Sequence, residues 1–300
     1  MQQSFKLRAP VSAALTHTPP PTRMPNMIYG TAWKKDQSDA LVSKALQSGF
    51  RGIDTACQPR HYNEALVGAG ARSFLLLQPE VKREDLYIQT KFSPRGGQDA
   101  ASCPYDPDLR PAEQVAASVA VSMRNLQLGY IDTLVLHSPF DQFEDTVEAW
   151  KAMFSYTPYS SDKNENIIHN IGVSNVDLQL LKRLVAKTGI YPSVVQNRLY
   201  RSTMFDIPLR KWCTENDVIY QSFWSLTANP DLLRHERISQ VAQKHGLSSA
   251  VALYAVILSE KNICVLNGTT DEEHMKEDLV IAENNPLAGT QELSKLLGVL

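Results

Sequence analysis

Short runs of β-forming residues alternate with longer segments of helical spacing along most of this chain of 300 residues. Apolar residues in the longer segments recur three and four positions apart, as at Val115, Val119 and Met123, so each segment can bury one helix face. The eight β-rich runs are residues 27–32, 50–54, 86–91, 131–137, 167–173, 193–196, 218–223 and 263–266. This alternation predicts repeated β-α-β units with a parallel sheet.

Eight strand–helix repeats favour a closed barrel over an open doubly wound sheet. The dinucleotide fingerprint G-x-G-x-x-G is absent after the first run, and the nearest glycine pair, Gly68 and Gly70, lies in a helical pattern. We therefore predict an α/β fold, a single-domain (β/α)8 TIM barrel over residues 26–300. Residues 1–25 are predicted to be a disordered lead-in, because the prolines at 19–21 interrupt any helix there.

Charge and cysteine content narrow the choice of partners and compartment. The 30 basic and 32 acidic residues give a net charge of −2, so we expect neither a nucleic acid nor a membrane as partner. Four scattered cysteines and the lack of any apolar run of about 18 residues predict a soluble protein of the cytoplasm. A weaker alternative is an organelle, because the lead-in has no acidic residue before Asp36, as in a transit peptide.

Charged or strongly polar residues end several of the apolar runs. Asp54, Lys91 and His137 end the second, third and fourth of them. A strand buried on both faces is expected to be apolar throughout, and the carboxyl ends of barrel strands meet on one face. Each residue alone has an ordinary explanation as a helix cap, a solvated lysine or a core histidine. Together they predict a functional site at the barrel mouth.

Five stretches around these residues resemble the aldo-keto reductases in order and approximate spacing, within residues 27–281. The stretches are residues 49–56 (GFRGIDTA), 62–64 (YNE), 88–91 (IQTK), 134–139 (LVLHSP) and 171–175 (IGVSN). The resemblance implies a (β/α)8 barrel, a nicotinamide cofactor bound across the strand ends, and reduction of aldehydes or ketones to alcohols.

Carried over to this sequence, the family's catalytic residues fall on Asp54, Tyr62, Lys91 and His137. Hydride delivery to a carbonyl carbon leaves an alkoxide, and Tyr62 is the implied proton donor. A phenol has a pKa of about 10, and a lysine ammonium about 4 Å away is expected to lower it by about 3. Asp54 is implied to keep Lys91 charged, and His137 to donate a hydrogen bond to the carbonyl oxygen.

The resemblance also implies contacts to cofactor and substrate. Ser174, Asn175 and Gln196 are implied to bind the nicotinamide carboxamide. Phe223 is implied to stack under the ring, where the family more often has tyrosine. The remaining implied contacts are Gly30 and Thr31 near the ring, and Trp33 and Trp224 in an apolar substrate pocket.

Two departures from the family pattern matter. Asp54 and Tyr62 are eight residues apart, more than in the usual motif, so His61 is the alternative proton donor if the longer loop displaces Tyr62. After the last strand, the lysine, arginine and asparagine that hold the 2′-phosphate of NADP are missing. The residues in this region are Gly268, Thr269, Thr270, His274 and Asp278. We expect phosphate to meet free backbone N–H groups of the helix that begins near Asp271, with Lys276 supplying the cation.

The expected function is reduction of a small-molecule carbonyl substrate, with NADP(H) as the preferred cofactor and NAD(H) as the alternative. A second hypothesis is a non-catalytic nucleotide-binding regulatory protein on the same barrel. A third, a metal-dependent hydrolase, is disfavoured because the sequence has no H-x-H or H-E-x-x-H motif, and no metal site is predicted.

Overall fold

Eight parallel strands close into a barrel in the computed structural model, which describes residues 2–10, 23–161 and 165–298. The strands are β3 (Met27–Gly30), β4 (Gly52–Asp54), β5 (Tyr87–Phe92), β6 (Ile131–Leu136), β7 (Ile168–Ser174), β8 (Val194–Arg198), β9 (Ile219–Phe223) and β10 (Ile263–Asn267). They follow one another around the ring in sequence order, and β10 pairs with β3 to close it. The eight β-rich runs of the sequence all form barrel strands, which confirms the predicted (β/α)8 fold.

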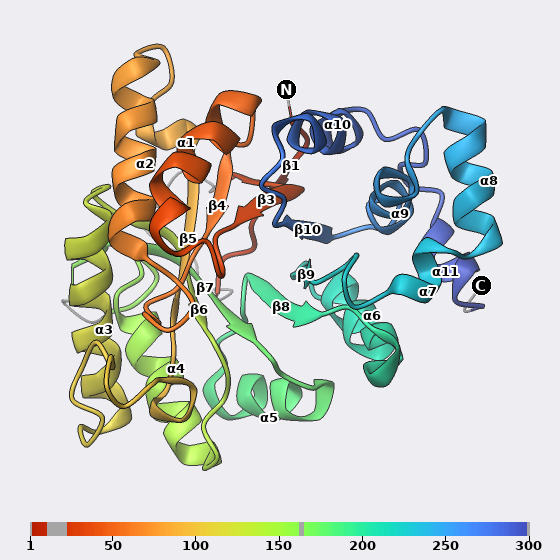
Figure 1. Cartoon of the computed structure of the whole chain (residues 1–300). Helices are drawn as coiled ribbons and strands as arrows, with labels where there is room; N and C mark the ends of the chain where they lie inside the picture. The colour runs from red at the N-terminus through yellow and green to blue at the C-terminus, as the bar shows by residue number, and fades with distance from the viewer. Residues whose placement is uncertain (1, 11–22, 162–164, 299–300) are drawn as a thin grey trace.

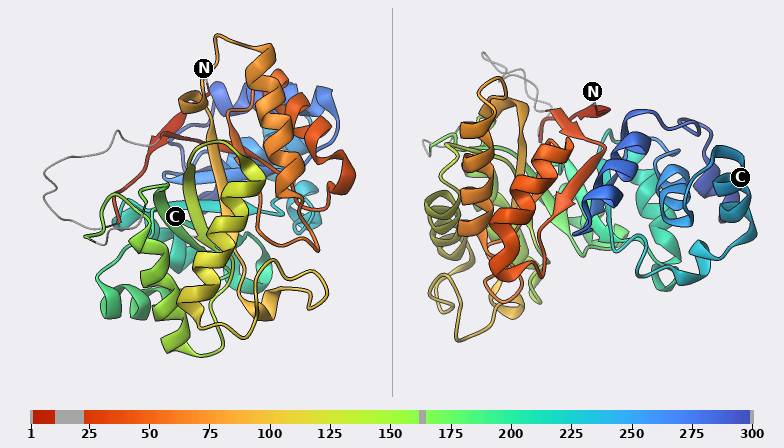
Figure 2. Two further views of the ribbon diagram at one scale, coloured as in Figure 1. Left: turned by 90° about the vertical axis from the view of Figure 1, so that its left-hand side faces the viewer. Right: turned by 45° about the horizontal axis from the view of Figure 1, so that its top comes forward.

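Helices cover the outside of the barrel, with the red-to-green half of the chain on one side and the green-to-blue half on the other (Figure 1). The helices are α1 (Ser38–Ser48), α2 (Glu64–Leu77), α3 (Pro111–Leu126), α4 (Phe143–Ser155), α5 (Leu178–Thr188), α6 (Ile207–Glu215), α7 (Pro230–Leu233), α8 (Glu236–His245), α9 (Ser249–Ile257), α10 (Glu272–Glu283) and α11 (Glu292–Leu296). Short 3₁₀ turns cover Lys35–Gln37, Arg83–Asp85, Arg95–Gly97 and Arg201–Asp206. Helices α1 and α2 lie side by side along the strands, as Figure 2 shows from two further directions.

Local sequence signals set several helix ends. The side chains of Asn63, Asp177 and Ser248 cap α2, α5 and α9 by accepting a hydrogen bond from the backbone N–H three residues on. Gly49 and Gly189 end α1 and α5 in the left-handed conformation, which glycine adopts without steric cost. Asn63 and Asp177 thus fix where two loops at the barrel mouth end, and the two glycines begin loops at the opposite end of the barrel.

The apolar core has an outer and an inner part. The outer part fills the space between helices and barrel and contains large buried side chains such as Phe50, Phe74 and Trp150. The inner part lies within the barrel and consists of Leu7, Met24, Ile28, Tyr87, Val135, Val194, Ile219 and Cys264. Because alternate residues of a strand point to the same face, these residues identify which positions of each strand face the interior.

The N-terminal segment contributes to the inner core. Strand β1 (Ser4–Lys6) pairs antiparallel with β2 (Arg23–Pro25), and Leu7, which follows β1, and Met24 of β2 are buried in the inner part. The predicted disorder is therefore wrong for these residues, because their apolar side chains gain free energy by packing inside the barrel. Residues 1 and 11–22 of the expected lead-in lie outside the described residues.

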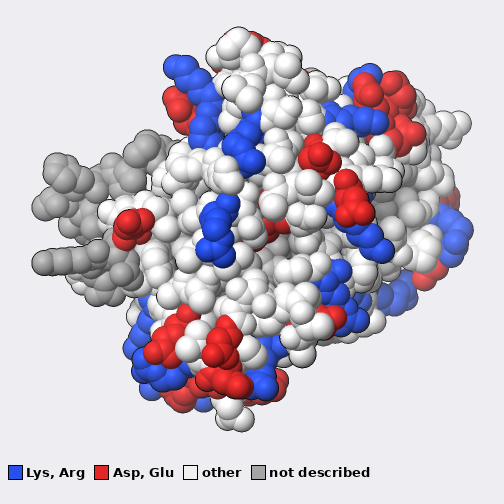
Figure 3. Space-filling model, turned by 60° about the vertical axis from the view of Figure 1, so that its left-hand side comes forward, with Lys and Arg blue, Asp and Glu red and all other residues white. Residues whose placement is uncertain are grey.

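Basic and acidic side chains lie interspersed on the molecular face drawn in Figure 3. Exposed pairs of opposite sign, such as Arg95 with Asp108 and Arg234 with Asp231, contribute to the mixed surface charge. Within the described residues, no helix combines the length and the apolar character that crossing a bilayer requires.

Replacing Gly172 with alanine is expected to destabilise the barrel. A Cβ atom at this position of β7 would lie 2.3 Å from Val194 Cγ2 and 2.9 Å from the Val194 carbonyl oxygen, so β7 and β8 would have to move apart. We expect the free energy of unfolding, measured by urea denaturation, to fall by about 1–3 kcal/mol. The control is Gly96→Ala, where the new Cβ would meet no atom within 4 Å. Equal effects of the two substitutions would contradict this prediction.

Candidate active site

Asp54 and Lys91 form a buried ion pair at the carboxyl ends of β4 and β5. Lys91 Nζ lies 2.6 Å from Asp54 Oδ2 and donates a second hydrogen bond of 2.9 Å to the carbonyl oxygen of Thr55. The two side chains are only 1% and 2% exposed. Burial lowers the pKa of Lys91, and the carboxylate of Asp54 opposes this effect. Each partner therefore compensates the other's charge at the barrel mouth.

Three glutamines inside the barrel, Gln89, Gln196 and Gln221, form what we call the glutamine belt. Gln89 Nε2 and Gln196 Nε2 donate to Asp54 Oδ1 at 2.7 and 3.1 Å, and both also donate to Gln221 Oε1 at 2.9 and 2.8 Å. Gln196, the predicted contact of the nicotinamide carboxamide, thus donates both amide hydrogens inside the barrel. Gln89 is not among the residues that the resemblance implies. A polar residue in a buried strand, two positions before Lys91, is nevertheless a sequence signal for it.

The loop between β4 and α2 places Tyr62 beside the ion pair despite its extra length. The backbone N–H groups of His61 and Tyr62 both donate to the carbonyl oxygen of Gln58, at 3.2 and 3.1 Å, and turn the chain back. The centroid of the Tyr62 ring lies 5.1 Å from Lys91 Nζ and 6.0 Å from the centroid of the His137 ring. The structure therefore brings the predicted tyrosine, lysine and histidine together.

The pKa of the Tyr62 phenol differs from the expectation. Burial raises this pKa well above its usual value, and the negative charge of Asp54 raises it further. The charge of Lys91, which Asp54 compensates at 2.6 Å, does not outweigh burial, so the pKa of Tyr62 is raised and not lowered. The expected depression by Lys91 is therefore wrong for this structure, and Tyr62 is a protonated phenol near neutral pH.

His137 follows β6 and lies next to a serine. Its backbone N–H donates to the carbonyl oxygen of Phe92 at 2.8 Å, and its Nδ1 lies 2.6 Å from Ser93 Oγ. Burial, and then the charge of Lys91, lower the pKa of His137 to about 3, so the imidazole is neutral. With Nδ1 engaged by the serine, Nε2 is the atom left for a ligand. Ser93, one residue beyond β5, is a site residue that the resemblance does not supply.

Protein stability is expected to depend on pH through His137. Because its pKa is about 3 in the folded protein and about 6.5 in the unfolded chain, only the unfolded chain binds a proton between these values. The free energy of unfolding should therefore fall as the pH decreases through this interval, by about 1.4 kcal/mol per pH unit from this group. Urea denaturation at several pH values measures the slope, with His137→Gln as the comparison. The same slope in both proteins would contradict the assignment.

The predicted ring contacts on β3 and β7 gather at the same mouth. The side chains of Thr31, Ser174 and Asn175 donate hydrogen bonds of 2.9, 2.6 and 2.8 Å to carbonyl oxygens at the end of β4, in the middle of β8 and just after β6. Gly30 brings the backbone of β3 close to β10, since a Cβ there would lie 3.4 Å from the Asn267 carbonyl oxygen. These bonds tie neighbouring strand ends together, and the contacts of the four residues with a nicotinamide stay predictions.

The start of α10 is less suited to a phosphate than expected. Asp271 Oδ1 accepts hydrogen bonds from the backbone N–H groups of Glu273 and His274, at 2.9 and 3.1 Å. These donors are thus engaged, and the capping carboxylate places negative charge where phosphate was expected. Lys276 lies 2.9 Å from Glu272 and 3.1 Å from Glu273. The expectations of free N–H groups at these two positions and of an available Lys276 are therefore wrong.

A different lysine lies near the segment after β10. Lys34 Nζ donates to the carbonyl oxygen of Gly268, and no carboxylate among the described residues pairs with it. Asp278 lies buried and accepts a 2.6 Å hydrogen bond from Asn267 Nδ2, and burial raises its pKa to about 6. The other predicted residues of this segment are Gly268, Thr270 and His274, which are exposed, and Thr269, which is half-buried. Lys34 is therefore the cation that the sequence argument misses here.

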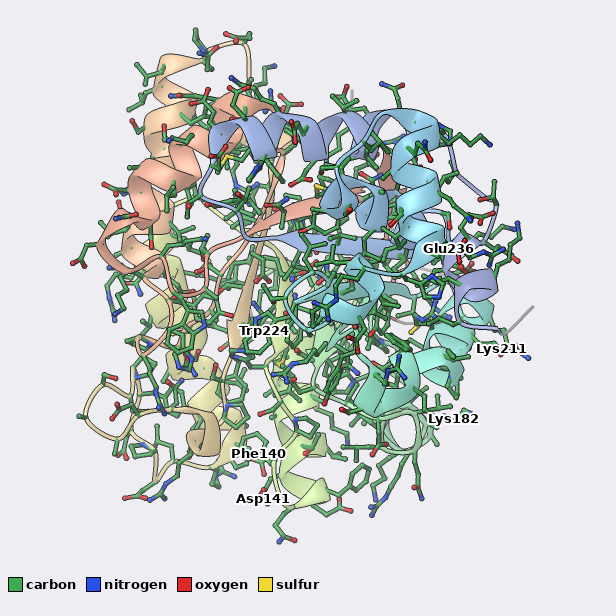
Figure 4. The ribbon with its side chains drawn as sticks, turned by 45° about the vertical axis from the view of Figure 1, so that its right-hand side comes forward. Phe140, Asp141, Lys182, Lys211, Trp224 and Glu236 are labelled. Atoms are coloured by element: carbon green, nitrogen blue, oxygen red, sulfur yellow. The ribbon has the colours of Figure 1, made fainter. Side chains whose placement is uncertain are left out.

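Aromatic side chains surround the mouth. Trp33 and Trp224, predicted to line a substrate pocket, are 56% and 48% exposed. The rings of Trp33 and His61 contact each other at a tilt of 42° with centroids 3.9 Å apart, and Phe223 meets Trp224 edge-on at 6.4 Å. In Figure 4, Trp224 lies toward the middle of the molecule, whereas Lys211 lies on the outer helix α6. The exposed tryptophans thus flank the loop that carries Tyr62 and the end of β9.

Comparison with known proteins identifies the family. The model of the aldo/keto reductase family matches residues 26–229. Methylglyoxal reductase DkgA of Escherichia coli (strain K12) is 30% identical over 231 residues, which cover 76% of this chain and 73% of that protein. Dihydrodiol dehydrogenase 3 of Bos taurus is 27% identical over 286 residues, covering 86% and 83% of the two chains. The crystal structure of an aldo/keto reductase from Brucella melitensis matches with a TM-score of 0.76 at 23% identity over 100% of both chains. Because the family model spans more than half of the sequence, the chain belongs to the aldo/keto reductase family.

Proposed function

We propose that this protein reduces aldehydes or ketones to alcohols by hydride transfer from NADPH, with Tyr62 as the general acid. The observation that carries the proposal is the position of the Tyr62 ring, 5.1 Å from Lys91 Nζ and 6.0 Å from the His137 ring. The alternative of a non-catalytic nucleotide-binding protein depends on the longer β4–α2 loop displacing Tyr62 from the site. With Tyr62 beside Lys91, the loop gives that alternative no support.

The proposed mechanism assigns one task to each side chain. Reduction adds a hydride to the carbonyl carbon and a proton to the oxygen, and the bound dinucleotide supplies the hydride. Ser93 Oγ lies 2.6 Å from Nδ1 of neutral His137. The mechanism assigns the tautomer in which the hydroxyl donates to Nδ1, so that Nε2 carries the proton and donates a hydrogen bond to the carbonyl oxygen. Tyr62 gives its phenolic proton to that oxygen, Lys91 stabilises the resulting phenolate, and a proton from water restores the phenol.

The protonation state of Tyr62 supports reduction over oxidation. Burial raises the pKa of its phenol, and so does the charge of Asp54. A protonated phenol is ready to donate, whereas alcohol oxidation needs a phenolate as base, which is scarce near neutral pH. The protonated phenol therefore suits the carbonyl reduction that we propose.

Residues at the mouth fit a dinucleotide. Phe223 offers a half-buried aromatic face, and Lys34 offers a cation beside Gly268. A Cβ at Gly268 would meet no atom within 4 Å, so a diphosphate can approach the backbone there. We propose NADP(H) as the cofactor on the strength of the family resemblance. NAD(H) is the second candidate, because Lys276 is paired with two glutamates and Asp271 caps α10.

Two measurements test the proposed function. The first follows NADPH consumption with 4-nitrobenzaldehyde and with methylglyoxal, the latter because the DkgA relatives are named methylglyoxal reductases. Turnover supports the reductase, and tight nucleotide binding without turnover over a broad carbonyl panel supports the regulatory protein instead. The second titrates NADPH against NADH by fluorescence. Equal or tighter binding of NADH would replace NADP(H) as the proposed cofactor.

A further inference from the structure

A second cation lies across the barrel from the buried ion pair. Arg198 is the last residue of β8, which stands four strands from β4 in the closed ring of eight. Gln196, two residues earlier, faces the interior, where it donates to Asp54 at 3.1 Å. Because alternate residues share a face, Arg198 also faces inward, one layer nearer the mouth. Lys91 follows Gln89 on β5 by the same two residues, so both cations lie nearer the mouth than the glutamine belt.

The described residues do not compensate the charge of Arg198. Its guanidinium lies 4.2 Å from the ring centroid of Trp224 and 5.1 Å from that of Tyr200. Throughout residues 2–10, 23–161 and 165–298, no carboxylate pairs with this guanidinium and no side-chain hydrogen bond engages its N–H groups. Two aromatic faces therefore hold a half-buried cation whose donors are free.

Such a guanidinium suits an oxyanion. Its planar donors match a carboxylate with two parallel hydrogen bonds, and partial burial strengthens the attraction compared with a solvated arginine. The diphosphate of a dinucleotide is the other anion that could reach the mouth. Lys34 already offers a cation for it beside Gly268, on the side of the barrel where β3 meets β10.

We propose that Arg198 binds the carboxylate of an acidic carbonyl substrate, which makes this protein selective for aldehydes or ketones that carry an acid group. The inference rests on the proposed function, because it places the substrate between Arg198 and the Tyr62–Lys91–His137 group. Phe223, the ladder partner of Arg198 on β9, borders the same space. The carbonyl oxygen then faces Tyr62 while the carboxylate faces the guanidinium.

The test compares 3- and 4-formylbenzoate with their methyl esters, which differ in charge but keep the same aldehyde. For the wild type we expect higher kcat/KM with the acids, and Arg198→Met should lower the acid-to-ester ratio by at least about tenfold. Arg198→Lys should retain part of the preference, because it keeps the charge and loses the two parallel bonds. The matched control is Arg201→Met, an exposed arginine three residues on, which should leave the ratio unchanged.

Three other results would overturn the proposal or its basis. An unchanged ratio in Arg198→Met removes the carboxylate site. If Arg198→Met lowers kcat/KM equally for acid and ester and also weakens NADPH binding, Arg198 binds the cofactor diphosphate. This result also overturns the substrate site. If the wild type reduces neither acid nor ester, the proposed function fails, and calorimetric titration with 4-(hydroxymethyl)benzoate then tests Arg198 directly. Binding that is lost in Arg198→Met supports the site, and equal binding by both proteins overturns it.

Discussion

Tyr62→Phe is expected to lower kcat for carbonyl reduction by about 100-fold or more, the contribution typical of a positioned general acid. Phenylalanine keeps the ring that lies near Lys91 and His137, so the pocket should keep its shape while the only transferable proton of the side chain is removed. Nucleotide affinity should stay unchanged. NADPH consumption with an activated aldehyde measures the first effect, and fluorescence titration with NADPH measures the second.

The matched control is Tyr130→Phe. Tyr130 stacks on His169 and stands just before β6, at the opposite end of the barrel from the mouth. Its loss of a hydroxyl should leave turnover at the wild-type level. If Tyr62→Phe also turned over at that level, the proton would come from another group, and His61→Gln would be the next variant to measure.

The barrel could be predicted from the sequence because its strands are buried on both faces. Such strands are nearly continuous apolar runs. Each of the eight predicted runs begins and ends within two residues of the observed strand. The lead-in was harder to predict, since Ser4–Lys6 and Arg23–Pro25 form strands only by pairing with each other. Their structure depends on a contact between distant segments, which local composition does not reveal.

The sequence predicts those residues of the candidate site that lie at the ends of barrel strands. Asp54 and Lys91 end neighbouring strands, so their meeting follows from the fold. The contact of Gln196 with Asp54 joins residues 142 positions apart across the barrel, and it depends on register and side-chain length. The raised pKa of Tyr62 also depends on three-dimensional structure, because it reflects burial and the compensation of the lysine charge.

Lys91→Met is expected to destabilise the fold and abolish turnover at the same time. Methionine has a similar length but no charge, so the Asp54 carboxylate, 2% exposed, would be left without a cation. Breaking a buried ion pair in this way typically costs about 3–5 kcal/mol. Hydrogen bonds from Gln89 and Gln196 to Asp54 Oδ1 remain and offset part of this, so we expect the lower end of that range. Urea denaturation measures the loss of stability, and NADPH consumption measures turnover.

The double variant Lys91→Met with Asp54→Asn separates the two effects. Asparagine keeps an oxygen that accepts from Gln89 and Gln196, and neither member of the buried pair is then charged, so stability should return close to the wild-type value. Turnover should stay low, because no ammonium faces the phenolate that Tyr62 becomes. Recovery of both stability and turnover would mean that Lys91 serves only the fold. If stability did not recover, the unpaired carboxylate was not the cause of the lost stability in Lys91→Met. Stability without turnover is the one outcome that places the ammonium in the chemistry, since the fold would then be intact and only the charge beside the phenol missing.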